Sequence, residues 1–331
     1  MALIELNASG NIGEGGDRIF QFGDYMVHVF LKDGMFYLPS TKSCDVLLVG
    51  GGGSGGASNN DNDCGSGGGG AGGALWREDY SISSGYYTIK VGRGGRSAPQ
   101  GAFNSNGHFY TTQNGEHTEA FSVQAMGGGC GGGSDNHKRA QEGGCGGGAG
   151  SRNSNSGWNT GRGSAQGTFS GWTAYTGSGG NGADLNCSGA GGGGIGGNGS
   201  DQSGGSNSSS SQGGAGGAGR DFGSYFGRTV GHNGWFGGGG GGGTYRHGTD
   251  TSYNAPPNNG ASNFGGGGYG VSARESSQNR NSFNVNLIHG MNGTGGGGGG
   301  GVENAYPQDD PWHGACHGRG GDGVVIIRYA L

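Results

Sequence analysis

The stretch Cys44–Val49 (CDVLLV) runs without a turn residue into Gly50–Gly56 (GGGGSGG). Its first half is a short apolar run typical of a buried β-strand. Its second half is nearly pure glycine, and similar tracts recur along the chain, in which 94 of 331 residues are Gly. This is about four times the usual proportion. The glycine tracts are therefore either the scaffold of the fold or flexible filler, and that choice decides the rest of the interpretation.

One regular structure suits polyglycine. The chain has only 6 Pro and no strict Gly-X-Y period, which excludes a collagen triple helix. A left-handed helix of the polyproline II type has three residues per turn and no internal hydrogen bonds. Because glycine has no Cβ, such helices can approach until their backbone N–H and C=O groups pair with one another. Gly237–Gly243 would form a rod of roughly 22 Å, and we expect a bundle of such rods.

The alternative is a disordered, low-complexity chain. Disordered chains are usually poor in aromatic residues, whereas the segments between these tracts contain five tryptophans: Trp76, Trp158, Trp172, Trp235 and Trp312. Strand-forming runs also occur near both ends of the chain. We therefore favour the scaffold interpretation.

The predicted architecture is all-β with polyglycine II and essentially no α-helix. After a leader over residues 1–16, a single glycine-rich domain spans 17–331, and its rod and loop region covers about 50–322. Strands are expected within about 18–49, with a hairpin-like turn at Asp33-Gly34, and at about 86–91, 118–126, 283–288 and 323–329. The run at 118–126 also passes directly into glycine. Strong strands near both termini indicate one β-structure that the two chain ends close.

Composition and motifs exclude several classes of function. The formal net charge is −5 and no Lys/Arg cluster stands out, so we expect no nucleic-acid partner. No run of about 18 apolar residues occurs, so we expect no membrane insertion, and Met1–Gly16 does not resemble a signal peptide. Gly-x-Gly-x-x-Gly matches arise from composition and lack a strand–turn–helix context. We predict no enzymatic activity, no catalytic residues and no cofactor.

Cysteine and histidine give weak signals. The six cysteines are Cys44, Cys64, Cys130, Cys145, Cys187 and Cys316, and their spacing fits no known framework, so disulfide pairing stays open. Cys130 and Cys145 are each followed by three glycines, and we expect them to pack between rods. His313, Cys316 and His317 are ligand types that zinc accepts, but no second cysteine pair stands near them. We predict no metal site.

Several motifs carry a family resemblance. These are Gly23–Phe30 (GDYMVHVF), Gly34–Phe36, Pro39, Asp45–Gly53 (DVLLVGGGG) and Gly320–Tyr329 (GGDGVVIIRY). They resemble the glycine-rich domain family of bacterial and bacteriophage proteins and, more distantly, the glycine-rich ectodomain of the anaplastic lymphoma kinase receptor family. The resemblance implies a small, jelly-roll-like β-sandwich from which a bundle of polyglycine II helices extends. The tract-and-loop region is similar to the polyglycine adhesins at the tail-fibre tips of T-even-like phages, whose variable loops bind host receptors.

The long segments between tracts are the candidate binding sites. They are 97–117, 151–188, 221–236, 244–264 and 302–317. Their Asn, Ser, Gly and aromatic residues resemble the composition of antibody binding loops. The predicted receptor contacts are Phe109, Tyr110, Trp158, Trp172, Tyr175, Tyr225, Phe226, Trp235, Phe236, Tyr245, Tyr253 and Trp312. Alternatively, individual aromatics among them only cover the ends and flanks of the bundle.

The resulting functional hypothesis is a non-enzymatic virion protein, of the phage tail-fibre, spike or capsid-fibre type, that acts as an adhesin in host recognition. Its expected partners are a protein or glycan receptor on the host surface and other virion proteins or copies of itself. Its expected location is the exposed surface or tail of the virion. The alternative is a structural subunit of a cell-surface, matrix or extracellular filament.

Overall fold

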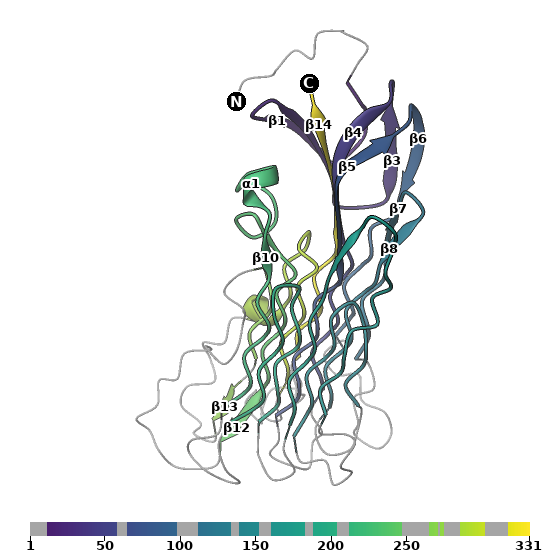
Figure 1. The fold of residues 1–331 in the computed structure, drawn as a ribbon. Helices are drawn as coiled ribbons and strands as arrows, with labels where there is room; N and C mark the ends of the chain where they lie inside the picture. The colour runs from purple at the N-terminus through teal and green to yellow at the C-terminus, as the bar shows by residue number, and fades with distance from the viewer. Residues whose placement is uncertain are drawn as a thin grey trace.

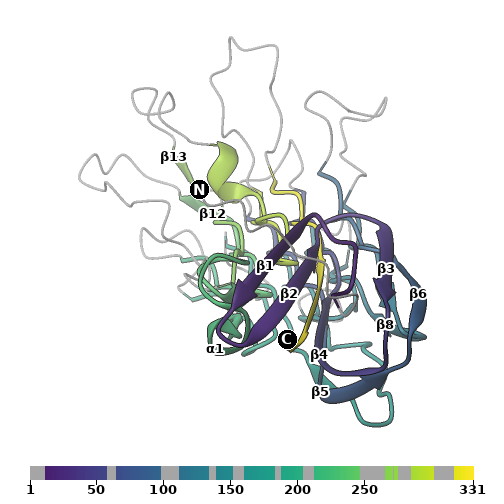
Figure 2. The same cartoon turned by 90° about the horizontal axis from the view of Figure 1, so that it is seen from above.

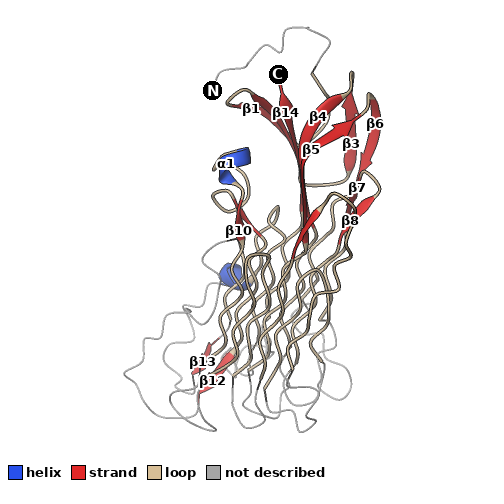
Figure 3. Cartoon of the chain, in the orientation of Figure 1, coloured by secondary structure: helices blue, strands red, loops and turns tan. Residues whose placement is uncertain are grey.

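The computed structural model describes residues 12–57, 65–97, 112–133, 139–151, 160–182, 188–203, 212–246, 265–270, 272–274, 285–301 and 317–331. Most of the β-strands occupy one end of the molecule, and long glycine-rich segments run away from them side by side (Figure 1). We call these segments rods. Within the described residues, helix is confined to α1 (Gly223–Phe226) and a 3-10 turn at Val285–Ile288. Figure 3 shows how little helix accompanies the strands and rods. The expected all-β fold without a long helix is confirmed.

The largest sheet has six antiparallel strands. Their spatial order is β1 (Arg18–Phe22), β2 (Tyr25–Phe30), β14 (Val324–Ala330), β4 (Lys42–Val49), β5 (Ala74–Ile82) and β9 (Thr173–Tyr175). The last strand of the chain thus lies between two of the first, with Ile326 opposite both Val29 and Leu47. Strands from near the two ends of the chain close one β-structure, as the sequence predicts.

Four further strand pairs complete the described β-structure. They are β3 (Gly34–Leu38) with β6 (Gly85–Ile89), β7 (Thr118–Ala120) with β8 (Val123–Ala125), β10 (Arg220–Asp221) with β11 (Trp235–Phe236), and the parallel pair β12 (Thr244–Arg246) with β13 (Ser272–Arg274). Seen from above, β3, β6 and β8 lie on one side of the six-stranded sheet, and α1 lies on the other (Figure 2).

Both faces of the six-stranded sheet are therefore covered. Along β4, Val46 and Leu48 face a core shared with β3, β6, β7 and β8, whereas Leu47 and Val49 face a core shared with the residues around α1. All four side chains are fully buried. A strand that is buried on both faces needs apolar residues at every position, and this explains the continuous apolar run at Val46–Val49.

The rods are held by backbone hydrogen bonds with a three-residue period. Residues 50–56 form the rod that follows β4, and their backbone N–H groups donate to three other rods in turn. Gly50, Gly53 and Gly56 donate to the carbonyls of residues 73, 70 and 67 in one rod. Gly51 and Ser54 donate to the carbonyls of 116 and 113 in a second, and Gly52 and Gly55 to those of 321 and 318 in a third. Its carbonyls accept from three more rods, through the N–H groups of Gly95, Gly128, Gly131, Gly298 and Gly301. This is the pattern of a polyproline II helix inside a lattice, and it confirms the scaffold interpretation.

Close backbone contact explains the glycine content. A Cβ built at Gly52 would collide with the carbonyl group of Gly296, and one at Gly55 with that of Gly299. At Ser54, between them, a side chain fits, and its hydroxyl accepts a 3.0 Å hydrogen bond from the N–H of Gln113. Glycine is thus required where one rod's backbone lies against the next.

Several local predictions differ from the structure. Asp33-Gly34 does not close a hairpin, because β2 and β3 belong to different sheets; the hairpin is β1–β2, with Gly23 at φ +61° in its turn. The run at 118–126 is two short strands joined at Phe121 and Ser122, both with positive φ. In the run predicted at 283–288, the described residues Val285–Ile288 form a 3-10 turn.

Candidate functional site

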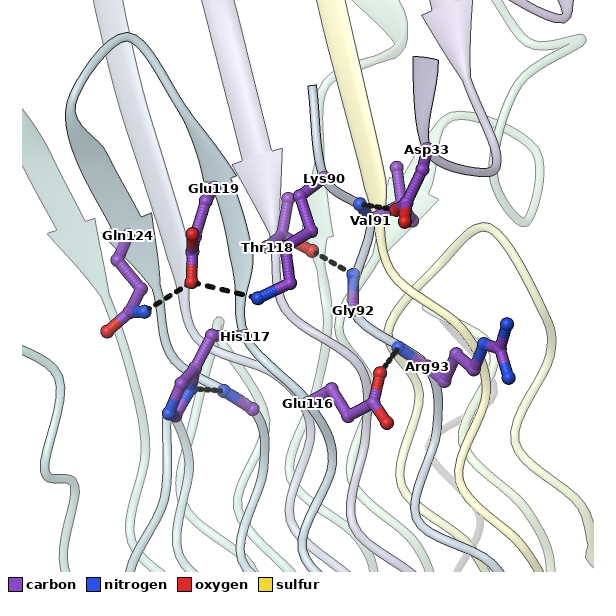
Figure 4. A network of polar contacts seen from close by, with 11 residues as sticks. Asp33, Lys90, Val91, Gly92, Arg93, Glu116, His117, Thr118, Glu119 and Gln124 are labelled. Carbon is purple, nitrogen blue, oxygen red and sulfur yellow. Dashed lines mark hydrogen bonds and ion pairs between the residues drawn. The ribbon is translucent and has the colours of Figure 1, made fainter. Parts of the chain in front are cut away.

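The junction between the sheet and the rods contains a network of polar side chains (Figure 4). Thr118, at the start of β7, is fully buried. Its hydroxyl donates to the carbonyl of Val49 at 2.8 Å and accepts from the N–H of Gly92 at 2.9 Å. Asp33 accepts a 2.8 Å hydrogen bond from the N–H of Val91. These side chains bond backbone groups where strand ladders end, and so they fix the positions at which rods leave the sheet.

Charged groups line the exposed side of this junction. The Glu119 carboxylate accepts a 2.8 Å hydrogen bond from the Gln124 amide and lies 3.2 Å from the Lys90 ammonium. The Gln124 hydrogen bond and, after it, Lys90 lower the pKa of Glu119. His117 accepts a 2.9 Å hydrogen bond from the N–H of Gly127 through Nδ1. Each of these groups has a structural partner, and they form no nucleophile–base pair.

The aromatic residues around α1 pack against the sheet. We call residues 220–236 the cap segment. Its Phe226 and Phe236 are fully buried against the sheet face that carries Trp76. Tyr225 is half-buried and donates a 2.7 Å hydrogen bond to the carboxylate of Glu78. That hydrogen bond, together with burial, raises the pKa of Tyr225.

A nearly buried ion pair fastens the cap segment to the sheet. Arg328 on β14 donates to the Asp45 carboxylate at 2.7 Å, and their side chains are only 11% and 12% exposed. The same guanidinium donates to the carbonyl of Tyr225 at 2.8 Å and lies over the rings of Tyr25 and Tyr225. The Arg328 side chain thus joins the six-stranded sheet to the cap segment.

The two aromatics of the β9 region also lie near the sheet. Trp172 is half-buried, and its ring centroid lies 5.6 Å from that of Tyr80 on β5. Tyr175 is half-buried, and the guanidinium of Arg220 lies 3.9 Å from its ring centroid. Both side chains therefore contribute to packing.

The predicted contact residues are thus only partly placed. The structure puts five of them beside the six-stranded sheet: Trp172, Tyr175, Tyr225, Phe226 and Phe236. Trp235 is half-buried and lies in β11, which pairs with β10. For Tyr245, only its place in β12 is described. The others lie outside the described residues: Phe109, Tyr110, Trp158, Tyr253 and Trp312.

Rod ends meet at the side of the bundle away from the sheet, which we call the distal end (Figure 1). Four backbone N–H···O=C hydrogen bonds of 2.8–3.0 Å connect them. The N–H of Gly301 donates to the carbonyl of Gly56, and the N–H of Ser66 donates to the carbonyl of Gly301. The N–H of Gly243 donates to the carbonyl of Ser66, and the N–H of Gly189 donates to the carbonyl of Gly243. These residues border the chain segments 58–64, 183–187, 247–264 and 302–316. Described residues that are far apart in the sequence therefore lie next to one another at the distal end.

Buried polar side chains mark this end. Ser66, Ser151, Ser188 and Thr244 are all fully buried. The Ser151 hydroxyl donates to the carbonyl of Gly65 at 2.7 Å. Thr244 accepts a 2.7 Å hydrogen bond from the N–H of Gly213. Sequence reasoning missed these residues. Serine and threonine next to a glycine tract were the available signal, but abundant serine in the loops obscured it.

Metal and thiol chemistry have little support in the described part of the chain. No group of three or more His, Cys, Asp and Glu side chains there is arranged to hold a metal ion. Cys44, Cys130 and Cys145 are buried and form no disulfide. Burial raises the pKa of Cys44 and of Cys145 to about 12, so both remain protonated and unreactive near neutral pH. No described helix is long and apolar enough to cross a membrane.

The comparisons with known proteins agree with this architecture. No curated protein matches the chain. A family described as a glycine-rich domain matches residues 33–330, a range that runs from the end of the β2–β3 connection to the end of β14 and takes in the rods between them. Because this match covers most of the sequence, the chain belongs to the glycine-rich domain family.

Proposed function

We propose that this protein is a non-enzymatic virion protein of the tail-fibre, spike or capsid-fibre type. Its distal end presents polar and aromatic segments to a protein or glycan receptor on a host surface. The observation that carries the proposal is the convergence of rod ends, such as Gly56, Ser66, Gly243 and Gly301, at one end of the bundle.

The rods suit this task because they are rigid without a large side-chain core. Each interior rod residue directs its N–H toward one of three neighbouring rods, so the rod ends are fixed relative to one another. A fixed base reduces the entropy lost when the segments it carries bind a partner. The sequence of those segments can then vary, while the backbone lattice that supports them stays the same.

The placement of the aromatics sharpens the proposed contacts. Trp172, Tyr225, Phe226 and Phe236 pack against the sheet, away from the distal end. The proposed receptor contacts are therefore the residues of the remaining segments: Phe109, Tyr110, Trp158, Tyr245, Tyr253 and Trp312.

Binding to intact cells tests the proposal. The full chain is labelled with a fluorophore, and its binding to a panel of bacterial strains is measured by flow cytometry. Replacing Trp158 and Trp312 with Ala together should reduce binding at least about tenfold and leave Tm unchanged, because a buried aromatic contact is worth more than about 1.4 kcal/mol. The matched control, Trp172→Ala, should lower Tm and leave binding intact.

The opposite pattern would count against an adhesin. If the double variant binds like the wild type, or if only Trp172→Ala abolishes binding, the receptor site is not at the distal end. If no strain is bound but the chain assembles as its concentration rises in analytical ultracentrifugation, the filament alternative is favoured. Antibodies raised against the chain should also label purified virions.

A further inference from the structure

The outer rods of the bundle are bonded by side chains as well as by the backbone. In the rod formed by residues 126–133, N–H groups point in three directions: those of Gly128 and Gly131 reach rod 50–56, and those of Gly129 and Gly132 reach rod 145–151. The third direction faces rod 112–117. There the N–H of Cys130 donates to Asn114 Oδ1 and that of Gly127 to His117 Nδ1, both at 2.9 Å.

Asn114 and His117 are three residues apart, and so are the two N–H groups that they bind. We call such an arrangement an acceptor pair. A side-chain atom here occupies the place that a backbone carbonyl takes in the interior of the bundle. A backbone hydrogen bond from the N–H of Gly115 to the carbonyl of Gly128, at 2.9 Å, also joins these two rods. The acceptor pair therefore supplies much of the bonding along this flank.

The same arrangement occurs on two other flanks. His289 Nδ1 and Asn292 Oδ1 accept from the N–H groups of Arg319 and Asp322, at 3.1 and 3.2 Å. Asn198 and Asp201 accept from the N–H groups of Ser178 and Asn181, at 2.9 and 2.6 Å. In every pair both the acceptors and the donors are spaced by three, which is one turn of the rod. The repetition shows that the spacing follows from rod geometry.

Two of these acceptors differ from the rest in their chemistry. An amide or carboxylate oxygen accepts hydrogen bonds throughout the physiological pH range, whereas imidazole Nδ1 accepts only in the neutral ring, because both nitrogens of the protonated ring are donors. Protonation would set the Nδ1–H of His117 against the N–H of Gly127, and that of His289 against the N–H of Arg319. From this geometry we propose that His117 and His289 make two flanks of the rod bundle sensitive to acid. When the pH falls, protonation of these histidines breaks their hydrogen bonds to the neighbouring rods, and the two flanks open.

Charged groups lie near both histidines. Glu119 on β7, with Lys90 bound to it, is the charged group that interacts with His117. Arg319 faces His289, and burial followed by this positive charge lowers the pKa of His289. His289 thus resists protonation while its flank is closed, so acid stabilises the open form relative to the closed one.

The test uses amide hydrogen exchange resolved by NMR on the full chain between pH 7.5 and pH 5. Rates are divided by the intrinsic rate at each pH to give protection factors. A released imidazole has a pKa of about 6.5, so protection at Gly127 and Arg319 should fall by up to about tenfold per pH unit below that value. Ser178 and Asn181, held by Asn198 and Asp201, serve as internal controls and should keep their protection.

The matched variant carries His117→Asn together with His289→Asn. Asparagine is already the other acceptor in each of these two pairs, at Asn114 and Asn292. The replacement therefore retains an acceptor that acid does not protonate. The acid-induced loss of protection at Gly127 and Arg319 should disappear in this variant. The proposal is overturned if the loss persists there, or if wild-type protection at these two amides stays constant down to pH 5.

Discussion

The phenolic oxygen of Tyr329, near the end of the chain, accepts a 2.7 Å hydrogen bond from the N–H of Gly13, near its beginning. The same oxygen lies 3.1 Å from Nε2 of His28, whose Nδ1 lies 2.7 Å from the carbonyl of Gly15. A carbonyl only accepts, so Nδ1 carries the proton and Nε2 accepts from the Tyr329 hydroxyl. This network fastens residues 13–15 to the six-stranded sheet and requires a neutral His28.

The His28 network makes stability depend on pH. His28 is fully buried, and burial lowers its pKa below the ordinary value of about 6.5. As the pH falls, the unfolded chain therefore binds a proton at His28 before the folded chain does. The stabilisation that the neutral His28 network provides is fully present above about pH 6.5 and is lost as the pH falls below that value. In His28→Asn the amide nitrogen can still donate to Gly15. As the pH falls below about 6.5, the difference in unfolding free energy between the wild type and this variant should narrow by up to about 1.4 kcal/mol per pH unit.

Denaturant melts at pH 7.5, 6.5 and 5.5 measure this difference. A constant gap between wild type and His28→Asn across these pH values would show that His28 is not the group that titrates. The double variant His117→Asn/His289→Asn provides a comparison, because it retains His28.

Thr118 should be more sensitive to loss of its hydroxyl than to loss of its methyl group. Thr118→Val leaves the buried N–H of Gly92 without its acceptor, which costs about 1–3 kcal/mol. Thr118→Ser keeps the hydroxyl and should cost less than the valine variant. Urea unfolding of both variants provides the measurement. Equal losses would mean that packing, and not the hydrogen bonds to Val49 and Gly92, determines the choice of residue.

A single methyl group in an interior rod should be strongly destabilising. Gly52→Ala places a Cβ against the carbonyl of Gly296, and overpacking of this kind costs about 1–3 kcal/mol. Gly163→Ala is the matched control, because nothing lies within 4 Å of a Cβ at that position. Thermal unfolding followed by calorimetry should show a lower Tm for the first variant alone. Similar Tm values for both would argue against close backbone packing of the rods.

Phe226 should act as the anchor of the cap segment. Phe226→Ala removes a fully buried ring from the core around Trp76 and should cost about 3–5 kcal/mol. Phe226→Leu preserves most of the apolar volume and should cost less. Tryptophan fluorescence during unfolding checks both values. A loss below about 1 kcal/mol for the alanine variant would show that the cap segment is held without this ring.

The sequence predicts the parts of the fold that local patterns determine. Cys44–Val49 and Val324–Tyr329 are apolar at almost every position, so their burial could be inferred from the chain alone. Ala74–Ile82 was missed as strand β5, because Arg77, Glu78 and Asp79 interrupt its apolar pattern. Those charged residues lie where the strand is exposed or half-buried, beside Asp45 and the cap segment.

The placement of the aromatics could not be read from the sequence. Tyr225 and Phe226 have the composition of a binding loop, yet they fill a core, because the six-stranded sheet has a second apolar face to cover. The acceptor pairs were also beyond sequence reasoning. Asn114 and His117 are informative only once the N–H groups of Cys130 and Gly127 are known to face them.

The three directions in which a rod sends its N–H groups also limit how such a chain can change in length. An insertion of one residue turns everything beyond it by about 120°, so each N–H would face the wrong neighbour. An insertion of three residues restores every direction and lengthens the rod by about 9 Å. Length variation within rods should therefore occur in steps of three, whereas the segments between rods are free of this rule.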